Sequence, residues 1–370
     1  MHRFKAIAGA LTLALLVPAA AAFAQVSGSA DFTTYVSLGD SLTAGFTSGS
    51  LVQDEQLNSY PALINAQAKG NAASGFQQPL VSQPGIPAIL QLRHLFPTVI
   101  SPKAGLGHPT NLTYPKPYNN LAVPGATLHN LVSTVTDNGG LHDLILRGLG
   151  TQIQQAAVLK PSFISVWIGN NDVLGAATSG VVIDGVTLTP LAAFQADFAK
   201  LVTALKATNA KLVFANIPRV TSLPFVTTIP PILVNPATNQ PVLINGAPVP
   251  LIGPNGPLRA GDHVLLTASA ELAVGKGIPV ALGGTGQPLS NTSVLSIEEA
   301  ATIDARRVQF NQVIKAAADA NSAAFVDAEA LLDQAGLTGI PVGGLTFTPA
   351  FLTGGIFGYD GVHPTPFGYA

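Results

Sequence analysis

Two segments near opposite ends of the sequence carry side chains that together could hydrolyse an ester. Ser41 follows Gly39 and Asp40 at the end of an apolar run, and His363 follows Asp360 near the last residue. A neutral imidazole can take the proton of a serine hydroxyl near neutral pH, and a carboxylate can fix the tautomer of that imidazole. Ser41 is therefore a candidate nucleophile, His363 its base and Asp360 the group that orients the base.

Two further segments offer hydrogen-bond donors for a developing oxyanion. Gly125 follows the apolar segment 120–123, and a residue without a side chain leaves its backbone N–H open to a ligand. Asn171 follows the very apolar segment 163–168, and its side-chain amide is a donor of the kind found in oxyanion holes. Taken one at a time, each of the four segments also fits an ordinary turn, loop or helix cap.

These segments need a framework that brings them together, and the apolar pattern predicts one. Five runs of β-branched or apolar residues, each followed by turn residues, are expected as strands: Thr33–Leu38, Asn120–Val123, Phe163–Ile168, Leu212–Ala215 and Ala323–Val326. Helical periodicity fills the gaps, most clearly from Leu191 to Leu205 and in a helix expected to begin near Ser296. Strands that alternate with helices predict a mainly parallel sheet, covered on both faces.

Placement at the carboxyl edge of that sheet is what makes the four segments stronger together than singly. The segments that contain Ser41, Gly125 and Asn171 follow directly after three successive expected strands. Open parallel sheets place their binding and catalytic sites at this edge. We therefore expect the three residues to converge there.

Composition excludes several other classes of protein. Of the 370 residues, 47% are hydrophobic and only 10% charged, and the formal net charge is −2 with no basic run. A nucleic-acid binder needs a phosphate-neutralising basic surface, so this class is not expected. The sequence has no Cys, so a disulfide or a zinc–thiolate site is excluded.

The first 24 residues are typical of a secretory signal peptide. A short basic head precedes an apolar stretch, and Ala22-Phe23-Ala24 provides a small-x-small cleavage site before Gln25. An uncleaved membrane anchor is the alternative. No later segment is apolar over the length of a membrane span, so we expect an exported protein, periplasmic or extracellular, with no stable span after cleavage.

Two long segments do not fit the alternation of strands and helices. Residues 47–119 and residues 219–295 are both too apolar to be free linkers, and we interpret them as insertions in a single domain spanning residues 25–370. The second insertion leaves the sheet after the run Leu212–Ala215, at the edge that carries the candidate site. It could cap the site or merely pad the domain, and the sequence leaves both open. The final helix begins only just before Ala370, so we expect it to be truncated.

In this combination and order, the four segments resemble the GDSL or SGNH hydrolase family of secreted bacterial serine esterases and lipases. The resemblance implies a three-layer α/β/α sandwich around a five-stranded, flavodoxin-like parallel sheet. It implies that Ser41 is both nucleophile and first oxyanion donor, that Gly125 and Asn171 are the second and third donors, that His363 is the general base and that Asp360 orients it. No cofactor and no metal are implied.

The expected function is hydrolysis of a carboxylic ester, small or lipid-like, through an acyl-serine intermediate. Carbohydrate deacetylation and acyl transfer could use the same residues and stay open, as does a non-catalytic exported binding module. A metal-dependent reaction on Asp360 and His363 would need further ligands, and none stands at a recognisable spacing. The oligomeric state is not predicted.

Overall fold

The computed structural model describes residues 30–370 except 71–74 and 96–97. The expected signal peptide, residues 1–24, lies outside the described residues. In the part of the chain that the structure describes, no helix is both long and apolar enough to cross a membrane.

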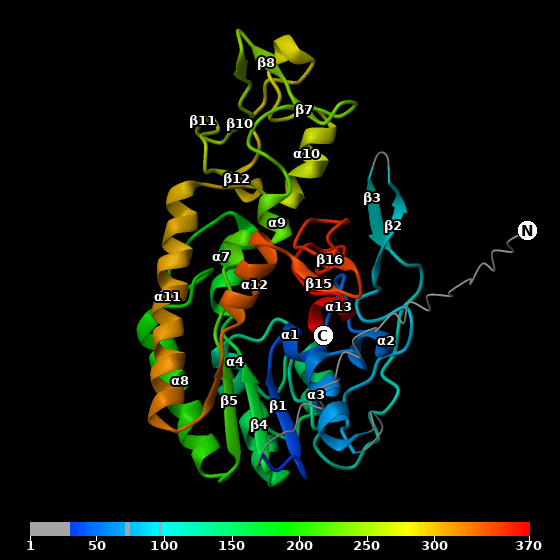
Figure 1. The fold of residues 1–370 in the computed structure, drawn as a ribbon, viewed down its shortest axis with the longest axis vertical. Coiled ribbons are helices and arrows are strands. Elements are labelled where there is room, and N and C mark those ends of the chain that lie inside the picture. The colour runs from blue at the N-terminus through cyan, green and yellow to red at the C-terminus, as the bar shows by residue number, and fades with distance from the viewer. Residues whose placement is uncertain (1–29, 71–74, 96–97) are drawn as a thin grey trace, which may run out of the picture.

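Four parallel strands form the central sheet, three of which are labelled in Figure 1 (β1, β4 and β5). They are β1 (Tyr35–Gly39), β4 (Phe163–Trp167), β5 (Lys211–Ala215) and β14 (Ala324–Val326), hydrogen-bonded in the order β1-β4-β5-β14. Each of the three strand pairs is parallel. Burial on both faces of β1 and β4 explains why these two strands are apolar runs rather than alternating patterns. Four of the five expected strands are confirmed.

The fifth expected strand, Asn120–Val123, is wrong as a strand. It lies beside β1 and joins it by a single bridge between Ser37 and Asn120. The next bond of the ladder is lost because the Gln152 side chain takes its place: the Gly39 N–H donates to Gln152 Oε1 at 3.0 Å, and Gln152 Nε2 donates back to the Gly39 carbonyl at 3.0 Å. A side chain from a distant helix thus takes the place of one ladder bond, which no local pattern could reveal.

Helices cover both faces of the sheet, as expected. Val166 pairs with Phe214, and Phe198 of α8 (Leu191–Lys206) packs on Phe214 with ring centroids 5.7 Å apart. Successive strand residues face opposite sides, so Trp167 points the other way, where its ring lies 5.7 Å from Tyr60 of α3 (Tyr60–Lys69). With α8, three further helices pack along the first face: α4 (Leu128–Ser133), α6 (Gln152–Val158) and α11 (Ile297–Ala320).

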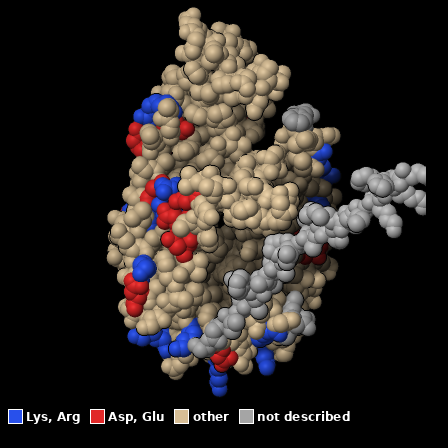
Figure 2. All heavy atoms as spheres, in the orientation of Figure 1, with Lys and Arg blue, Asp and Glu red and all other residues tan. Residues whose placement is uncertain are grey.

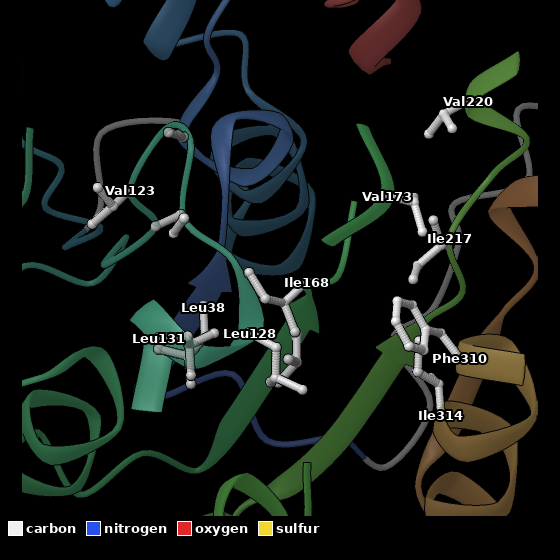
Figure 3. Packing of buried hydrophobic residues seen from close by; sticks show 14 of the residues in the cluster. Leu38, Val123, Leu128, Leu131, Ile168, Val173, Ile217, Val220, Phe310 and Ile314 are labelled. Carbon is white, nitrogen blue, oxygen red and sulfur yellow. The ribbon is translucent and has the colours of Figure 1, made fainter. Parts of the chain in front are cut away.

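Local signals set the helix boundaries where the sequence predicted them. Ser296 caps α11 in a capping box, in which its hydroxyl accepts the Glu299 N–H while the Glu299 side chain accepts the Ser296 N–H. Helix α8 begins at Leu191, as the periodicity indicates. Figure 3 shows how the helices close the core: Leu128 and Leu131 of α4 lie near Leu38 of β1 and Ile168.

The remaining elements of the main body lie, in the sequence, between the strands of the sheet or after the last of them. They are α1 (Ser41–Ala44), α2 (Gln53–Gln56), β2 (Leu90–His94), β3 (Val99–Pro102), α5 (Leu141–Leu146), α7 (Asn171–Ser179), α12 (Ala328–Leu337), β15 (Ile340–Val342), β16 (Leu345–Phe347) and α13 (Pro366–Tyr369). In α13 Tyr369 is buried while Phe367 is exposed.

Residues 219–295 form a lobe at one end of the molecule (Figure 1). Its base belongs to the main core through Val220, Leu223, Val226 and Leu265. Its outer part has a small core of its own, made by Leu251, Val264, Ala268, Leu289 and Val294. Figure 2 shows that the outer lobe presents almost no charged side chains on this face.

Short elements build the lobe. They are η1 (Val220–Ser222), α9 (Pro224–Thr227), β6 (Val234–Asn235), β7 (Gln240–Pro241), β8 (Leu243–Ile244), β9 (Ala247–Pro248), β10 (Ile252–Gly253), β11 (Gly256–Pro257), β12 (His263–Val264), η2 (Leu266–Ala268), α10 (Ser269–Ala273), η3 (Val280–Leu282), η4 (Asn291–Ser293) and β13 (Val294–Leu295).

Candidate active site

Ser41 is the first residue of α1, directly after β1, and its side chain is almost completely buried. The preceding residue, Asp40, caps this short helix because its Oδ1 accepts the Leu42 N–H at 3.0 Å. A side chain at Gly39 would collide with the Trp167 carbonyl of β4 and the Thr43 hydroxyl. The strand-to-helix turn therefore requires glycine at position 39.

The Asp40 carboxylate is fully buried beneath the nucleophile. The Asn170 amide donates to its Oδ2 at 2.8 Å, so both carboxylate oxygens are paired. Burial raises the pKa of Asp40 to about 6, against the opposing effect of the hydrogen bonds from Asn170 and Leu42. The pair ties the turn after β1 to the turn after β4.

His363 connects the serine to a carboxylate. Its Nε2 lies 2.9 Å from Ser41 Oγ, and its Nδ1 lies 2.9 Å from Asp360 Oδ2. With Nδ1–H donating to Asp360, Nε2 is the acceptor that faces the hydroxyl. The Phe46 ring packs against the imidazole, with centroids 4.8 Å apart. The three residues that the sequence placed at opposite ends of the chain thus form one hydrogen-bonded series.

Asp360 is held by backbone donors on several sides. Its Oδ1 accepts the N–H groups of Val362 and His363, both at 2.9 Å, and its Oδ2 accepts the Gly49 N–H at 2.7 Å. Burial by itself raises the pKa of a carboxyl, but here the neighbouring His363 and these hydrogen bonds outweigh it and hold the pKa of Asp360 below its usual value. Asp360 is therefore ionised at neutral pH, as an orienting carboxylate must be.

The two other candidate donors lie in neighbouring turns. Gly125 has a φ of +81°, and no heavy atom lies within 4 Å of the position that a Cβ would take, so its surroundings are open. The backbone N–H groups of Ser41 and Gly125 donate no hydrogen bond to any residue that the structure describes. Asn171 Nδ2 donates to the Ala126 carbonyl at 3.0 Å, which leaves its second amide hydrogen for a ligand.

Hydrogen bonds interlock the turns that carry these donors. The Val123 N–H donates to the Gly39 carbonyl at 3.2 Å, and Asp172 Oδ2 accepts the Leu128 N–H at 2.8 Å. Burial raises the pKa of Asp172 to about 7. Together with the bond from Asn171 to Ala126, these contacts bring the segments around positions 41, 125 and 171 to one edge of the sheet, as expected.

Sequence reasoning missed several supporting groups. The Asn170 amide, the Gln152 side chain and the Gly49 N–H have no counterpart among the predicted site residues. Asn170 stands next to a predicted donor, so the doubled asparagine was a visible signal. Gly49 and Gln152 reach the site from other segments of the chain, and no local sequence pattern predicts that they contact it.

Neither of two surface hollows in the described part of the chain contains Ser41. One lies beside α11 and is lined by Asn311 and Glu329 among others, and one lies between Asn255 and Glu299. Within the described ranges, no group of three or more His, Asp or Glu residues is arranged to hold a metal ion.

Comparison with known proteins gives the family. The model of the GDSL-like lipase/acylhydrolase family matches residues 35–370. The chain belongs to this family. As a GDSL-family member it is a hydrolase that acts on ester bonds. Among curated proteins, none matches the chain.

Several solved structures are similar to this GDSL hydrolase. They include an acetyl-xylooligosaccharide esterase from a Geobacillus species (15% identity, 90% of this chain and 88% of that chain, TM-score 0.36). They also include an extracellular lipase from Streptomyces rimosus, with 16% identity over 91% of this chain and 94% of that chain and a TM-score of 0.35. A phospholipase A1 from Streptomyces albidoflavus is similar at 15% identity over 90% of this chain and 93% of that chain, with a TM-score of 0.34. An acetylxylan esterase variant from Geobacillus stearothermophilus matches 68% of this chain and 66% of its own, at 16% identity and a TM-score of 0.30.

Proposed function

We propose that this hydrolase cleaves carboxylic esters with apolar acyl groups through an acyl-serine intermediate on Ser41. The observation that carries the proposal is the hydrogen-bonded series from Ser41 Oγ through His363 to Asp360, with both links at 2.9 Å. A hydroxyl in contact with an imidazole that a carboxylate orients is the arrangement that activates a serine nucleophile.

The reaction would proceed in two displacements. His363 Nε2 takes the Ser41 proton as Oγ attacks the ester carbonyl, and the same nitrogen then gives the proton to the departing alcohol. Water repeats the sequence and releases the acid. Asp360 keeps its charge throughout and stabilises the imidazolium.

The tetrahedral oxyanion would be held by donors from three turns. These are the N–H groups of Ser41 and Gly125, which form no other hydrogen bond with the described residues, and the second amide hydrogen of Asn171. Donors already in place lower the barrier because they need no reorganisation as charge develops. Neither a metal nor an organic cofactor takes part in this scheme.

An uncharged, apolar substrate suits the surroundings of the site. The segment 334–359, which leads directly to Asp360, contains no Asp, Glu, Lys, Arg or His. Such a segment offers no partner for a charged acyl group, and burying an unpaired charge is costly. Acetylated carbohydrates and acyl acceptors other than water remain the alternatives for the same residues.

Labelling with a fluorophosphonate probe tests the proposal. The probe should modify wild-type protein at Ser41, and the Ser41→Ala variant should stay unlabelled. A panel of p-nitrophenyl esters of increasing chain length, with and without a chelator, then defines the reaction. An unlabelled wild type would indicate a binding module, and activity lost to the chelator would indicate a metal-dependent reaction.

We further propose that the protein is exported. The support is the pattern of residues 1–24, with Ala22 and Ala24 flanking Phe23 before Gln25. N-terminal sequencing of the exported protein should begin at Gln25. A mature chain that begins at Met1 would contradict cleavage.

A further inference from the structure

The hairpin formed by β15 and β16 carries an apolar stripe on one face. In its register Ile340 pairs with Phe347 and Val342 pairs with Leu345. Side chains of directly paired residues lie on the same face of a sheet, and so do residues two apart along a strand. All four apolar side chains therefore share one face, while the pair Pro341 and Thr346 occupies the other.

Three of the four side chains face solvent, while Phe347 is half-buried and packs against the main core. Val342 is 55% exposed and Leu345 65% exposed, and Ile340 is 37% exposed. The turn Gly343-Gly344, with φ of +58° and +84°, is the tight two-residue type that joins the strands of a hairpin. Exposed apolar residues are common one at a time, but a contiguous apolar stripe on a hairpin marks an interaction site.

The stripe continues toward the candidate site. Phe347 stacks on Phe367 of α13, with ring centroids 5.1 Å apart, and Phe367 is itself 69% exposed. In the same helix Tyr369 Oη donates to the Phe46 carbonyl at 2.6 Å, and the Phe46 ring packs on His363. One short helix thus joins the inner end of the stripe, at Phe347, to Phe46, which packs on the imidazole.

The chemistry of the stripe defines what it can contact. From Gln334 to Tyr359 the chain has no Asp, Glu, Lys, Arg or His, and Figure 2 shows no charged side chain where this hairpin lies. An anionic lipid surface is recognised by Lys and Arg, which are missing here. A polysaccharide needs hydrogen-bond partners, and the stripe has none. The side chains stand out from the surface and line neither hollow, so they fit an extended apolar surface rather than one enclosed acyl chain.

We propose that the stripe Ile340–Val342–Leu345–Phe347, together with Phe367, docks on the surface of an aggregated, net-uncharged ester substrate. Docking would bring the candidate site next to substrate molecules at that surface. This inference rests on the proposed function, because it assumes that the substrate is an apolar ester. It assigns the stripe a separate role from the residues that carry the chemistry.

Flotation of the Ser41→Ala variant with phosphatidylcholine vesicles tests docking without any turnover. We expect this protein to float with the vesicles. The additional pair Val342→Asp and Leu345→Asp should lower the partition coefficient by at least about tenfold, because apolar side chains drive interfacial binding. Thr346→Asp, on the opposite face of the same hairpin, is the matched control and should change partitioning by less than about twofold, as expected for a residue outside the contact.

Several results would overturn the proposal. These are no flotation of the parent variant, equal losses for the stripe pair and for Thr346→Asp, or binding that appears only after anionic phosphatidylglycerol is added. A dimer in sedimentation velocity that the stripe pair dissociates would also overturn it, because the stripe would then be an interface between two copies. Thermal melting verifies folding, and the single Leu345→Asn variant replaces the pair if the pair does not fold.

The proposed function and the docking surface fail independently. Flotation that depends on the stripe, in a protein whose wild type no fluorophosphonate labels, would contradict only the acyl-serine reaction. Labelling at Ser41 without flotation would contradict only the docking surface.

Discussion

The two halves of the candidate site are held in place by different means. The half that carries Ser41, Gly125 and Asn171 is built into the turns after the central strands. The half that carries Asp360 and His363 lies in a segment between β16 and α13 that has no helix or strand of its own.

Buried side chains support the first half. Asn170 pairs with Asp40, Gln152 pairs with both backbone groups of Gly39, and Asp172 accepts the Leu128 N–H. Each of these bonds joins one strand-end turn or helix to another in the main core. Their loss would disturb the fold itself, because a buried polar group without a partner is costly.

Peripheral segments support the second half. Gly49, at the start of the segment 47–119, donates to Asp360, and Phe225, in the base of the lobe, donates its N–H to the Gly361 carbonyl at 2.9 Å. A Cβ on Gly361 would lie 2.8 Å from Leu266 Cδ1 and 2.9 Å from the Phe225 nitrogen. Residues from the segments 47–119 and 219–295 thus contact the turn that carries the histidine, although neither residue belongs to the sheet.

The difference implies that the two halves should respond differently to mutation. Damage to the first half should lower both stability and turnover. Damage to the supports of the second half should lower turnover more than stability.

Ser41→Ala and His363→Ala should each lower kcat/KM by about 10⁴-fold, because nucleophile and base act as a unit. The double variant should lose no more than either single variant. Steady-state kinetics on a soluble p-nitrophenyl ester measures this. A Ser41→Ala enzyme that keeps more than about a hundredth of the wild-type rate would contradict its role as nucleophile.

Asn171→Ala should lower kcat by about 10²- to 10³-fold with little change in KM, because an oxyanion donor acts in the transition state. Asn170→Ala is the matched control from the adjacent position. It should lower the free energy of unfolding by about 1–3 kcal/mol, because it leaves the buried Asp40 carboxylate without its donor. Equal kcat losses for the two variants would show that Asn171 is not the donor.

Gly361→Ala should lower kcat by about 10- to 100-fold while most of the stability remains, because small displacements of a catalytic group are expensive. Its φ of +68° and its contacts with the lobe both oppose a side chain. Gly246→Ala is the matched control, since Gly246 has a φ of +78° with no atom near its Cβ position. Its turnover should be unchanged.

Gly39→Ala is the corresponding glycine substitution in the half of the site that carries Ser41, Gly125 and Asn171. The new Cβ would collide with the backbone of β4, so we expect the melting temperature to fall sharply along with activity. If Gly361→Ala instead unfolds the protein while Gly39→Ala does not, the comparison between the two halves is wrong.

The buried carboxylates of the first half should make stability depend on pH. Burial raises the pKa of Asp40 from 3.8 to about 6, so the folded state keeps a proton that the unfolded state releases. Its contribution is fully present below pH 3.8 and is lost as the pH rises through 6. Asp172, with a pKa raised to about 7, acts in the same direction.

Chemical denaturation of wild type and Asp40→Asn at several pH values between 4 and 7 measures this effect. Asn170 Oδ1 is buried and has no hydrogen-bond partner among the described residues, so a flipped Asn170 amide can pair with the new side chain. The wild-type advantage over Asp40→Asn should shrink as the pH rises. An advantage that grows with pH would show that Asp40 is ionised across this range.

The outer lobe should matter least. Residues 234–248 can be replaced by a short Gly-Ser linker, because Leu233 and Val249 already meet through a hydrogen bond of 2.8 Å. The rates of hydrolysis of an acetate ester and of a long-chain ester should both stay within about twofold of the wild-type rates, as expected for surface loops away from a site. A selective loss of long-chain activity would instead support the cap that the sequence left open.

Much of the framework follows from the sequence alone. The four strands, the helices α8 and α11 and the Ser296 capping box depend on patterns within a few residues of one another, and such patterns act locally. Placement of Ser41 and Asn171 at one edge also follows, because parallel strands end on the same side of a sheet. Gly125 lies near them although the segment before it is not a strand.

Only the tertiary structure decided the rest. Gln152 replaces the ladder bond that would have extended Asn120–Val123 into a fifth strand, and the Gly49 N–H completes the support of Asp360 across 311 positions of the chain. The apolar stripe on β15 and β16 is visible only once the hairpin register and its exposure are known. All of these features have one physical reason. Each depends on which groups, distant in the sequence, form hydrogen bonds or bury one another when the chain packs. Local conformational propensity carries no information about those pairings.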